Sequence, residues 1–561
     1  MSFEDNEVYC NGVRVASAEA LPENAVVQFS AVSRRNVVRL QDVDGSGRVR
    51  VDLRDAVGCE FVLGSNNVVD DGELSVIFPA EAGRPTVGSF VRLGHANTFA
   101  ASATLQAPSA PGTGISIGSR NVIGQGFSIR SGGPAIFDIA TGGRSNPEAG
   151  SAIGSRNWFG DRVTVLDRGS VGSDSVLALG TTVGSDWSGA GHMVLEGSPA
   201  RVISDGVSWA QGLHHSVLGS VPAPILTVGV TTYERPQTVR RAIASILNQE
   251  LPSGVEVEVL IVDDGSESEA FKELWVELKD LPRADSFSVQ GLRNAESTGG
   301  PSAGRNAVID MARGSHIMFL DDDDQFAEGA LAPLVEYLAS SDAQRVSLRH
   351  RRGDRSVFLA PAVWHENLDI IDSLWTMLAL SAYRTSDIRR YRSGFPAGVH
   401  YGEDSEFVLH FTVRSEQFSS MCDRDYVVLG DPVAGESAHL SQGKGSWEGF
   451  LSGIISHLER FGGIIRDSGL PAYDRDRLAV KAILSRSVAS YQMLRRLGEL
   501  NDIDLAGNLL GAYSAVINSG ISQPAIMRFA REHSLEREIT AVVANDLAAL
   551  RAARAPAEVA K

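Results

Sequence analysis

The chain has 561 residues, of which 43% are hydrophobic and 21% charged, and it carries a formal net charge of −18. This length and composition predict a folded protein of about three or four domains and exclude a disordered chain. The negative charge argues against a nucleic-acid partner, and the lack of apolar runs of about 18 residues argues against a transmembrane segment.

The N-terminus and the cysteines bear on the cellular compartment. Residues 1–7 are acidic and lack the apolar stretch of a signal peptide. Cys10, Cys59 and Cys422 are far apart and odd in number, which argues against a disulfide framework and fits a reducing compartment. We therefore expect a cytoplasmic protein, and leave peripheral association with the inner face of the cell membrane open.

A six-residue period of apolar residues runs through residues 71–203. Glycine often follows directly, as Gly154 follows Ile153 and Gly160 follows Phe159. This period is typical of the hexapeptide repeats of a parallel β-helix, where the periodic residue points into the core and glycine fits the tight corner. A Gly-rich β-sandwich is the alternative. The periodic positions are Val87, Leu93, Phe99, Leu105, Ile117, Ile123, Ile129, Ile153, Phe159, Val165, Val171, Leu177 and Val183.

The repeats end in Val-Leu-Glu-Gly-Ser-Pro-Ala-Arg-Val-Ile, residues 194–203. This stretch resembles the closing segment of left-handed β-helix acyltransferases. The resemblance implies a left-handed β-helix over residues 71–203 that assembles as a homotrimer. We expect residues 1–70 to form an N-terminal β cap and residues 204–223 to form a linker.

The segment of residues 131–147 is similar to a motif of the sugar O-acetyltransferases in that family. The general base of those enzymes is a histidine, but the matching position here is Pro134, which cannot accept a proton. The resemblance therefore implies a β-helix that lost acyl transfer and kept a scaffold role. The residues that do match are Ile136, Phe137, Asp138, Thr141, Gly142 and Arg144.

Strands and helices alternate after the linker. This alternation predicts an open, mostly parallel α/β sheet with helices on both faces. After residue 435 apolar residues recur at i, i+4, i+5 and i+8, which predicts a helical domain over residues 436–561. In the α/β part we predict strands over 226–230, 255–262 and 316–320 and helices over 239–247 and 305–312.

Carboxylates follow two of the predicted strands. Asp263 and Asp264 end the second strand, and the third is followed by four aspartates in a row, Asp321, Asp322, Asp323 and Asp324. The carboxyl ends of parallel strands line the crevice where such sheets bind ligands. Carboxylate oxygens are the ligands that Mg²⁺ and Mn²⁺ prefer. A solvated acidic turn or a calcium loop is the alternative for the four aspartates.

These motifs resemble the inverting glycosyltransferases of family two, which have a GT-A fold. The resemblance covers residues 224–435, with a nucleotide-sugar-binding part over 224–345 and an acceptor-binding part over 346–435. It implies that Asp321 and Asp323 ligate Mg²⁺ or Mn²⁺. The residues implied in binding the UDP part of the donor are Thr231, Tyr233, Asp263, Asp264, Asp321, Asp322 and Asp323.

Residues 297–306, Ser-Thr-Gly-Gly-Pro-Ser-Ala-Gly-Arg-Asn, are similar to an element of the wall-teichoic-acid glycosyltransferases that decorate poly(ribitol phosphate). The resemblance implies that Arg305 binds the donor diphosphate, for which a guanidinium offers paired donors. Those relatives also carry a Glu-Asp pair before an apolar helix, here Glu403 and Asp404. By the same resemblance, Asp404 is the general base, Glu403 binds or orients the acceptor, and His439 reaches the diphosphate. A helix cap for Asp404 and a packing role for His439 are the alternatives.

Arginines are dense between residues 345 and 392. They suit a polyanionic acceptor such as a polyol-phosphate chain, and Arg352 and Arg384 are our acceptor candidates. A solvated face with local ion pairs is an equal alternative. The full set is Arg345, Arg349, Arg351, Arg352, Arg355, Arg384, Arg389, Arg390 and Arg392.

The expected fold is therefore multidomain: an all-β left-handed β-helix, a GT-A α/β domain and a C-terminal helical domain. The resemblance implies a metal-dependent inverting hexosyltransferase that moves a sugar, GlcNAc or a related hexose, from a UDP-sugar to a hydroxyl of an anionic cell-envelope glycopolymer. Two alternatives stay open. One is a bifunctional sugar O-acetyltransferase and glycosyltransferase, and the other is a non-catalytic trimeric scaffold.

Overall fold

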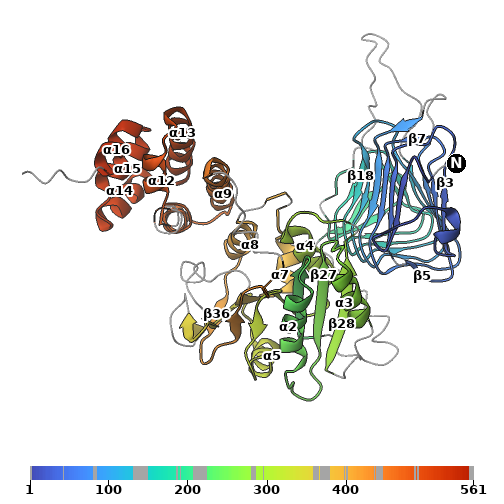
Figure 1. Cartoon of the computed structure of the whole chain (residues 1–561), viewed down its shortest axis with the longest axis horizontal. Helices are drawn as coiled ribbons and strands as arrows, with labels where there is room; N and C mark the ends of the chain where they lie inside the picture. The colour runs from blue at the N-terminus through green and yellow to red at the C-terminus, as the bar shows by residue number, and fades with distance from the viewer. Residues whose placement is uncertain are drawn as a thin grey trace, which may run out of the picture. The chain divides into compact units, whose positions relative to one another are not determined.

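Figure 1 shows the whole chain as a computed structural model. The chain divides into two compact units: residues 1–222 with 260–281 and 289–298, and residues 223–259 with 282–288 and 299–561. The structure describes residues 3–41, 43–79, 85–130, 150–184, 187–189, 191–205, 224–279, 286–294, 296–357, 365–366, 380–396, 398–399, 402–434, 436, 447–485, 488 and 492–554.

In the described part of residues 7–205, strands stack in three main sheets (Figure 1). Neighbouring strands pair in parallel, apart from the terminal pairs β1–β2 and β24–β25. The first sheet runs β2 (Val13–Arg14), β1 (Glu7–Cys10), β4 (Val37–Leu40), β8 (Glu60–Leu63), β12 (Phe90–Leu93), β15 (Gly114–Ile117), β18 (Ser151–Ile153) and β21 (Ser170–Val171). The second runs β23 (Thr182–Val183), β20 (Thr164–Leu166), β17 (Phe127–Arg130), β14 (Ala103–Gln106), β10 (Glu73–Ile77), β6 (Arg48–Asp52) and β3 (Ala25–Gln28). The third runs β25 (Arg201–Asp205), β24 (Met193–Glu196), β22 (Val176–Leu177), β19 (Trp158–Phe159), β16 (Val122–Ile123), β13 (Thr98–Phe99), β9 (Asn67–Val69) and β5 (Val43–Asp44).

The predicted six-residue register largely matches the core of this stack. Phe99, Ile123 and Phe159 occupy successive strands of one sheet, and none has exposed surface. Val87 is an exception, because it is 44% exposed while Thr86 is fully buried. Both belong to β11 (Thr86–Val87), which pairs with β7 (Ala56–Val57) in a separate small sheet. In this strand the residue before the predicted core position is the buried one.

Buried asparagines run along the stack as a ladder. Asn97 Nδ2 donates to Asn67 Oδ1 at 3.0 Å, and Asn121 Nδ2 donates to Asn97 Oδ1 at 2.9 Å. The backbone N–H of Asn157 donates to Asn121 Oδ1, also at 2.9 Å. All four side chains are fully buried, so each amide satisfies polar groups that burial would otherwise leave unbonded. Strands before residue 70 belong to the same sheets, so the stack begins ahead of the boundary that the repeats suggest.

The predicted α/β sheet is present and is mixed. β26 pairs in parallel with β29, whereas β35 is antiparallel to both β29 and β31. Its order in the described residues is β28 (Phe287–Arg293), β27 (Val257–Asp263), β26 (Leu226–Thr232), β29 (His316–Asp321), β35 (Ser381–Arg384), β31 (Arg345–Leu348), β36 (Phe418–Met421) and β34 (His365–Glu366). A smaller sheet runs β30 (Gln325–Phe326), β37 (Val427–Leu429), β32 (His350–Arg352) and β33 (Arg355–Val357).

The helices of this part include both predicted ones, each beginning a few residues earlier than expected. Gly229 lets α4 approach β26 closely, since a Cβ at Gly229 would lie 2.5 Å from Val308 Cγ1. The helices are α2 (Pro236–Leu247), α3 (Glu269–Lys279), α4 (Pro301–Met311), α5 (Leu331–Ser340), α7 (Thr385–Arg390) and α8 (Glu403–Thr412).

The C-terminal part is helical, as the spacing predicted. Apolar residues of α9 and α13 share one buried cluster, with Ile454, Leu458, Leu510 and Ile517 fully enclosed. Among the described residues, no helix combines the length and apolar character that crossing a membrane requires. The helices are α9 (Trp447–Arg466), α10 (Ala472–Ala479), α12 (Met493–Glu499), α13 (Ile503–Gly520), α14 (Gln523–Glu532), α15 (Glu536–Val543) and α16 (Leu547–Arg554), with a π-helical segment over Val480–Ser485.

The buried imidazole at the start of β29 gives the fold a predicted sensitivity to acid. Burial, followed by the nearby Arg384 charge, lowers the pKa of His316 to about 4 from an ordinary 6.5. Between pH 6.5 and pH 4, His316 is protonated in the unfolded chain but neutral in the folded chain. The folded state is therefore favoured most above pH 6.5, and the free energy of unfolding decreases as the pH falls below that value. Against His316→Gln, we expect the wild type to lose about 2–3 kcal/mol between pH 7 and pH 4.

Urea unfolding of both proteins at the two pH values measures this difference. The control is His533→Gln, because His533 is exposed just after α14. Parallel losses of stability in the wild type and His316→Gln would contradict the prediction.

Candidate functional site

The four consecutive aspartates lie at the carboxyl end of β29, and their side chains differ in burial. Thr231 pairs with Asp321 in the β26–β29 ladder, so the first predicted strand also ends here. The Asp321 side chain is 41% exposed. Asp322, Asp323 and Asp324 are each no more than 6% exposed. Asp321 is therefore the aspartate most open to a ligand.

The last residue of β26 and a residue just after that strand hold the second aspartate. Asp322 Oδ2 accepts from Thr232 Oγ1, and Asp322 Oδ1 accepts from Arg235 Nη1, both at 2.9 Å. The same Arg235 nitrogen lies 3.8 Å from Asp323 Oδ2. Burial raises the pKa of Asp322 to about 6, although the Arg235 charge acts to lower it. Asp322 thus ties the acidic run to the end of β26.

The last two aspartates are fixed by the segment after β37. Gly430 N donates to Asp324 Oδ1 at 3.0 Å, and a Cβ at Gly430 would lie 2.0 Å from Asp323 O. Only glycine permits that approach. Arg241 Nη2 donates to Asp323 O at 3.1 Å. Burial, with the charges of Asp321 and Asp323, raises the pKa of Asp324 to about 8.

The acidic run has the chemistry of a hard-cation site. Its donors are all carboxylate oxygens, and the charges of Asp321 and Asp323, which add to the effect of burial on the pKa of Asp324, are charges that a divalent cation would offset. Asp321 is exposed enough to ligate a cation, whereas Asp323 is nearly buried with Arg235 close to its carboxylate, so the two ligand roles stay a prediction. Among the residues outside the gaps given above, no group of three or more His, Cys, Asp or Glu side chains is already arranged to hold a metal ion.

Arg305, on α4, bridges the acidic run and the Glu-Asp motif. Its Nη2 donates to Asp321 Oδ1 at 2.8 Å and its Nη1 donates to Glu403 Oε1 at 3.1 Å. The side chain is 7% exposed. Burial opposes the charged guanidinium, but Asp321, Glu403 and Asp404 together raise the pKa of Arg305. The structure thus brings together three motifs that the sequence places far apart.

Aromatic packing fixes the position of α8. Asn306 Nδ2 donates to Phe395 O, and Phe395 N donates to Asn306 Oδ1, both at 2.8 Å. The Phe395 ring stacks on Phe407 of α8 at a centroid distance of 4.5 Å and lies edge-on to Phe319 of β29 at 5.1 Å. Such contacts contribute about 0.5–1.5 kcal/mol each beyond area burial. They hold α8 against the strand that carries the aspartates.

Glu403 and Asp404 occupy the first turn of α8. Asp404 Oδ1 accepts from the backbone N–H of Ser405 at 2.6 Å. Burial, and then the Asp404 charge, raises the pKa of Glu403, while Arg305 acts to lower it. The pair therefore combines a carboxylate tied to Arg305 with a neighbouring half-buried carboxylate on the same turn.

The two aspartates at the end of β27 hold turns within their own unit. Asp263 is fully buried, accepts from Ser266 Oγ at 2.6 Å, and lies 3.2 Å from Arg293 Nε. Burial raises the pKa of Asp263 to about 6. Asp264 accepts from Asn294 Nδ2 at 2.8 Å and from Thr298 N at 2.9 Å. Asp264 therefore secures the segment that leads into the Gly-Gly-Pro turn, and its nucleoside role remains a prediction.

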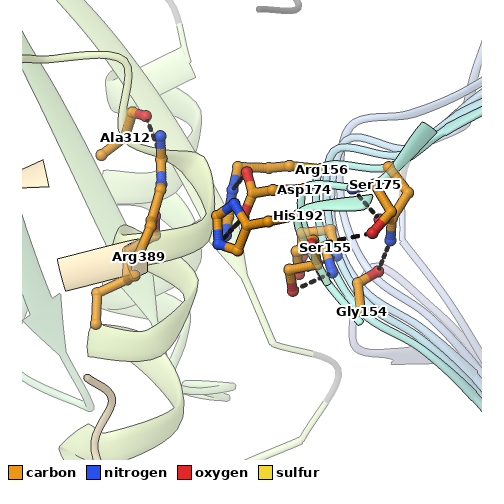
Figure 2. A network of polar contacts seen from close by, with 12 residues as sticks. Gly154, Ser155, Arg156, Asp174, Ser175, His192, Ala312 and Arg389 are labelled. Atoms are coloured by element: carbon orange, nitrogen blue, oxygen red, sulfur yellow. Dashed lines mark hydrogen bonds and ion pairs between the residues drawn. The ribbon is translucent and has the colours of Figure 1, made fainter. Parts of the chain in front are cut away.

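The predicted arginine-rich region divides into buried and exposed members. Arg345 is fully buried and donates to Ser381 Oγ and Thr412 Oγ1, both at 3.2 Å, so it belongs to the core and not to an acceptor surface. Arg389 donates to Ala312 O at 2.7 Å at the end of α4 (Figure 2). Arg352 is 57% exposed beside Asp431, and Arg384 is 28% exposed beside Asp387. Arg352 is therefore exposed, whereas Arg384 is half-buried and pairs with His316 at the start of β29, at the opposite end of that strand from Asp321.

Tyr233 lies just past β26, where it is 43% exposed and free of the buried core. His439 and the acyltransferase-like segment of residues 131–147 lie outside the described residues.

In the β stack, Figure 2 shows Arg156 paired with Asp174, whose Oδ2 is 2.7 Å from Arg156 Nη2 and 3.9 Å from His192 Nε2.

Several supporting residues were given no role by the sequence analysis. Thr232, Arg235 and Arg241 hold the aspartates, and Asn306 fixes Phe395. Except for Arg241, their signal was weak but present. Thr232 and Arg235 closely flank Tyr233, and Asn306 directly follows Arg305, whereas no motif points to Arg241.

Comparisons with known proteins found a family model and several relatives that match part of the chain. Residues 227–395 match the model of the family "Glycosyl transferase family 2". The chain is 22% identical to the poly(ribitol-phosphate) β-glucosyltransferase of Bacillus spizizenii over 38% of this chain and 33% of that protein. It is 23% identical to the poly(ribitol-phosphate) β-N-acetylglucosaminyltransferase TarP of Staphylococcus aureus over 41% of this chain and 69% of that protein.

A solved structure is also similar to the chain at low identity. The crystal structure of S. aureus TarS 1–349 in complex with UDP-GlcNAc is 17% identical, with a TM-score of 0.49 over 58% of this chain and 90% of that one. The chain spans one third of the length of the B. spizizenii relative. By the match to the family model, residues 227–395 form a glycosyltransferase family 2 domain.

Proposed function

We propose that the chain is a metal-dependent inverting glycosyltransferase of GT-A fold. It moves GlcNAc or a related hexose from a UDP-sugar to a hydroxyl of an anionic cell-envelope glycopolymer of the teichoic-acid kind. The observation that carries the proposal is the Arg305 guanidinium between Asp321 and Glu403, which links the donor and acceptor motifs. The names of the TarP and B. spizizenii relatives support the acceptor class.

The donor half of the proposal rests on the residues around β26 and β29. Tyr233 offers an exposed ring for a nucleobase, and Thr231 lies beside Asp321 in the ladder. Asp263 and Asp264 are assigned to the nucleoside, and His439 to the diphosphate, by resemblance. A divalent cation held by Asp321 and Asp323 would offset the charge that develops on the departing diphosphate.

Asp404 is the general base of this proposal. An inverting reaction needs one carboxylate beside the acceptor hydroxyl, on the side opposite the leaving group. Asp404 takes the hydroxyl proton as the oxygen forms its bond to the anomeric carbon and the bond to UDP breaks. Glu403, tied to Arg305, orients the acceptor, while the exposed Arg352 supplies positive charge for a polyanion.

The β stack has a supporting role in the proposal. We assign it as a left-handed β-helix that holds three copies of the chain together, in a cytoplasmic enzyme at the inner face of the membrane. The six-residue period and the parallel pairing of its strands support a β-helix.

Removal of the metal gives the direct test. With Mn²⁺ or Mg²⁺ present, we expect the full chain to hydrolyse one UDP-sugar, with UDP-GlcNAc tested first, and EDTA to abolish this turnover. Asp323→Asn should lower turnover at saturating Mn²⁺ by about a hundredfold or more, because one cation ligand is lost. Release of UDP measures each rate.

The matched control is Asp342→Asn, since Asp342 is exposed in the loop after α5. Its turnover should equal that of the wild type. Full turnover in EDTA would contradict the metal dependence, and the absence of turnover with every UDP-sugar and both metals would contradict the donor assignment.

A further inference from the structure

A buried polar contact joins α8 to the C-terminal helices. His457, on α9, has no exposed surface, and its Nδ1 lies 3.1 Å from Glu406 Oε1 on α8. Glu406 is 6% exposed and also accepts from Arg460 Nε at 2.7 Å. Because an ionised carboxylate only accepts hydrogen bonds, His457 Nδ1 is the donor.

The same imidazole lies against the residue that begins α8. Gly402 has a φ of +77°, and a Cβ added there would lie 2.4 Å from His457 Cε1 and 2.6 Å from its Nδ1. Gly402 O accepts the first backbone hydrogen bond of the helix, from Glu406 N at 3.0 Å. One ring therefore contacts both ends of the first turn of α8, and Glu403 and Asp404 lie between those ends.

Apolar packing continues the contact along both helices. Leu409 of α8 and Val413, just after its end, share a buried cluster with Ile454, Ile455 and Leu458 of α9. Each of these side chains is no more than 5% exposed. Since closely packed interiors transmit displacement, a shift of α9 moves α8 with it.

We propose that His457 is a positioning residue for the glycosyltransferase reaction. It acts through Glu406 and Gly402 to hold the first turn of α8, and so fixes the direction of the Asp404 carboxylate and the contact between Glu403 and Arg305. Through this contact, α9 of the C-terminal helices helps to position the residues of the site. The inference rests on the proposed function and adds a residue that no motif of the catalytic part contains.

Two substitutions separate the hydrogen bond from the shape of the ring. His457→Phe keeps a ring and loses the donor, whereas His457→Asn keeps a donor near Nδ1 and loses the ring. In the full chain with UDP-GlcNAc and Mn²⁺, we expect His457→Phe to lower kcat on the order of ten- to hundredfold, with KM within about twofold of the wild type. His457→Asn should keep kcat within about threefold. The reverse order would overturn the inference, because it would mean that ring packing alone matters.

A pair of glycines tests the contact from the other side. Gly402→Ala puts a Cβ against the imidazole, whereas Gly469→Ala imposes a similar backbone strain, at φ +72°, with nothing within 4 Å of the new Cβ. We expect Gly402→Ala to lower kcat at least about tenfold and Gly469→Ala to leave it within about twofold. Equal kcat losses in the two variants would count against a positioning role.

Backbone hydrogen exchange tests the same contact independently of enzymatic turnover. In the full chain, His457→Phe should speed exchange of the backbone amides of residues 405–409 about tenfold or more, and leave those of α2 unchanged. Unchanged exchange over 405–409 overturns the inference. If exchange responds but no variant or wild type turns over a UDP-sugar, the positioning contact stands and the proposed function fails.

Discussion

Asp404→Asn should abolish sugar transfer and leave UDP binding intact. General-base catalysis contributes about 10²–10⁴-fold to rate, so we expect turnover with an acceptor to fall by about three orders of magnitude. Asparagine has nearly the same shape as aspartate and keeps the Oδ1 that accepts from Ser405 N, so the fold of the first turn of α8 is preserved. Titration calorimetry with UDP and Mn²⁺ should give a Kd within about twofold of the wild type.

Two controls decide what such a loss means. Asp342→Asn makes the same chemical change at an exposed loop position and should keep full activity. Glu403→Gln removes the neighbouring carboxylate and should raise the KM for the acceptor more than it lowers kcat, as expected for a residue that orients the acceptor. Loss of UDP binding in a folded Asp404→Asn variant, or wild-type turnover, would remove Asp404 from the role of base.

The core of the β stack could be predicted from sequence because its signal is repeated. The same inward-facing apolar position recurs every six residues. Ile123, Phe159 and Val165 were assigned to the core on this basis, and all three are buried. Val87 broke the rule because its strand pairs outside the main sheets. The buried asparagines also recur along the stack, but their hydrogen bonds to one another could be identified only from the structure.

The candidate site could be predicted only in pieces. The acidic run and the Glu-Asp pair are local patterns that sit at the ends of elements, so the sequence places them. Arg305 lies 16 residues from Asp321 and 98 from Glu403, and nothing local announces that one guanidinium contacts both. His457 follows Glu406 by 51 residues in a different helix, so it could not be found without the packing of α8 on α9.

Arg305 should tolerate no substitution, and its loss should affect stability and catalysis together. Arg305→Met leaves the Glu403 carboxylate, which is 13% exposed, without its positive partner, and breaking a buried ion pair costs about 3–5 kcal/mol. We expect a drop of that size in the free energy of unfolding measured with urea. Because the guanidinium also aligns Glu403 beside Asp404, kcat should fall on the order of a hundredfold or more.

The pH dependence of the same variant has a definite sign. Arg305 acts to lower the pKa of Glu403, which burial and Asp404 already raise. Removing the guanidinium therefore raises the pKa of Glu403 further, so Glu403 is protonated, and lost as a negative group of the site, at a higher pH than in the wild type. The acid limb of the kcat/KM profile should move to higher pH in Arg305→Met, and a limb at the wild-type position would contradict the assigned electrostatic role.

Arg305→Lys distinguishes charge from geometry. Lysine keeps the positive charge but lacks the planar fork that reaches two carboxylates at once. In Arg305→Lys we expect the acid limb of the kcat/KM profile to return most of the way to its wild-type pH, while kcat recovers only slightly from its value in Arg305→Met. The control is Arg495→Met, an exposed arginine 3.6 Å from Glu499 on the surface of α12, where the ion pair is solvated and its removal should change neither quantity. Full recovery of kcat in Arg305→Lys would mean that the site needs a cation at this point and not a bridge between Asp321 and Glu403.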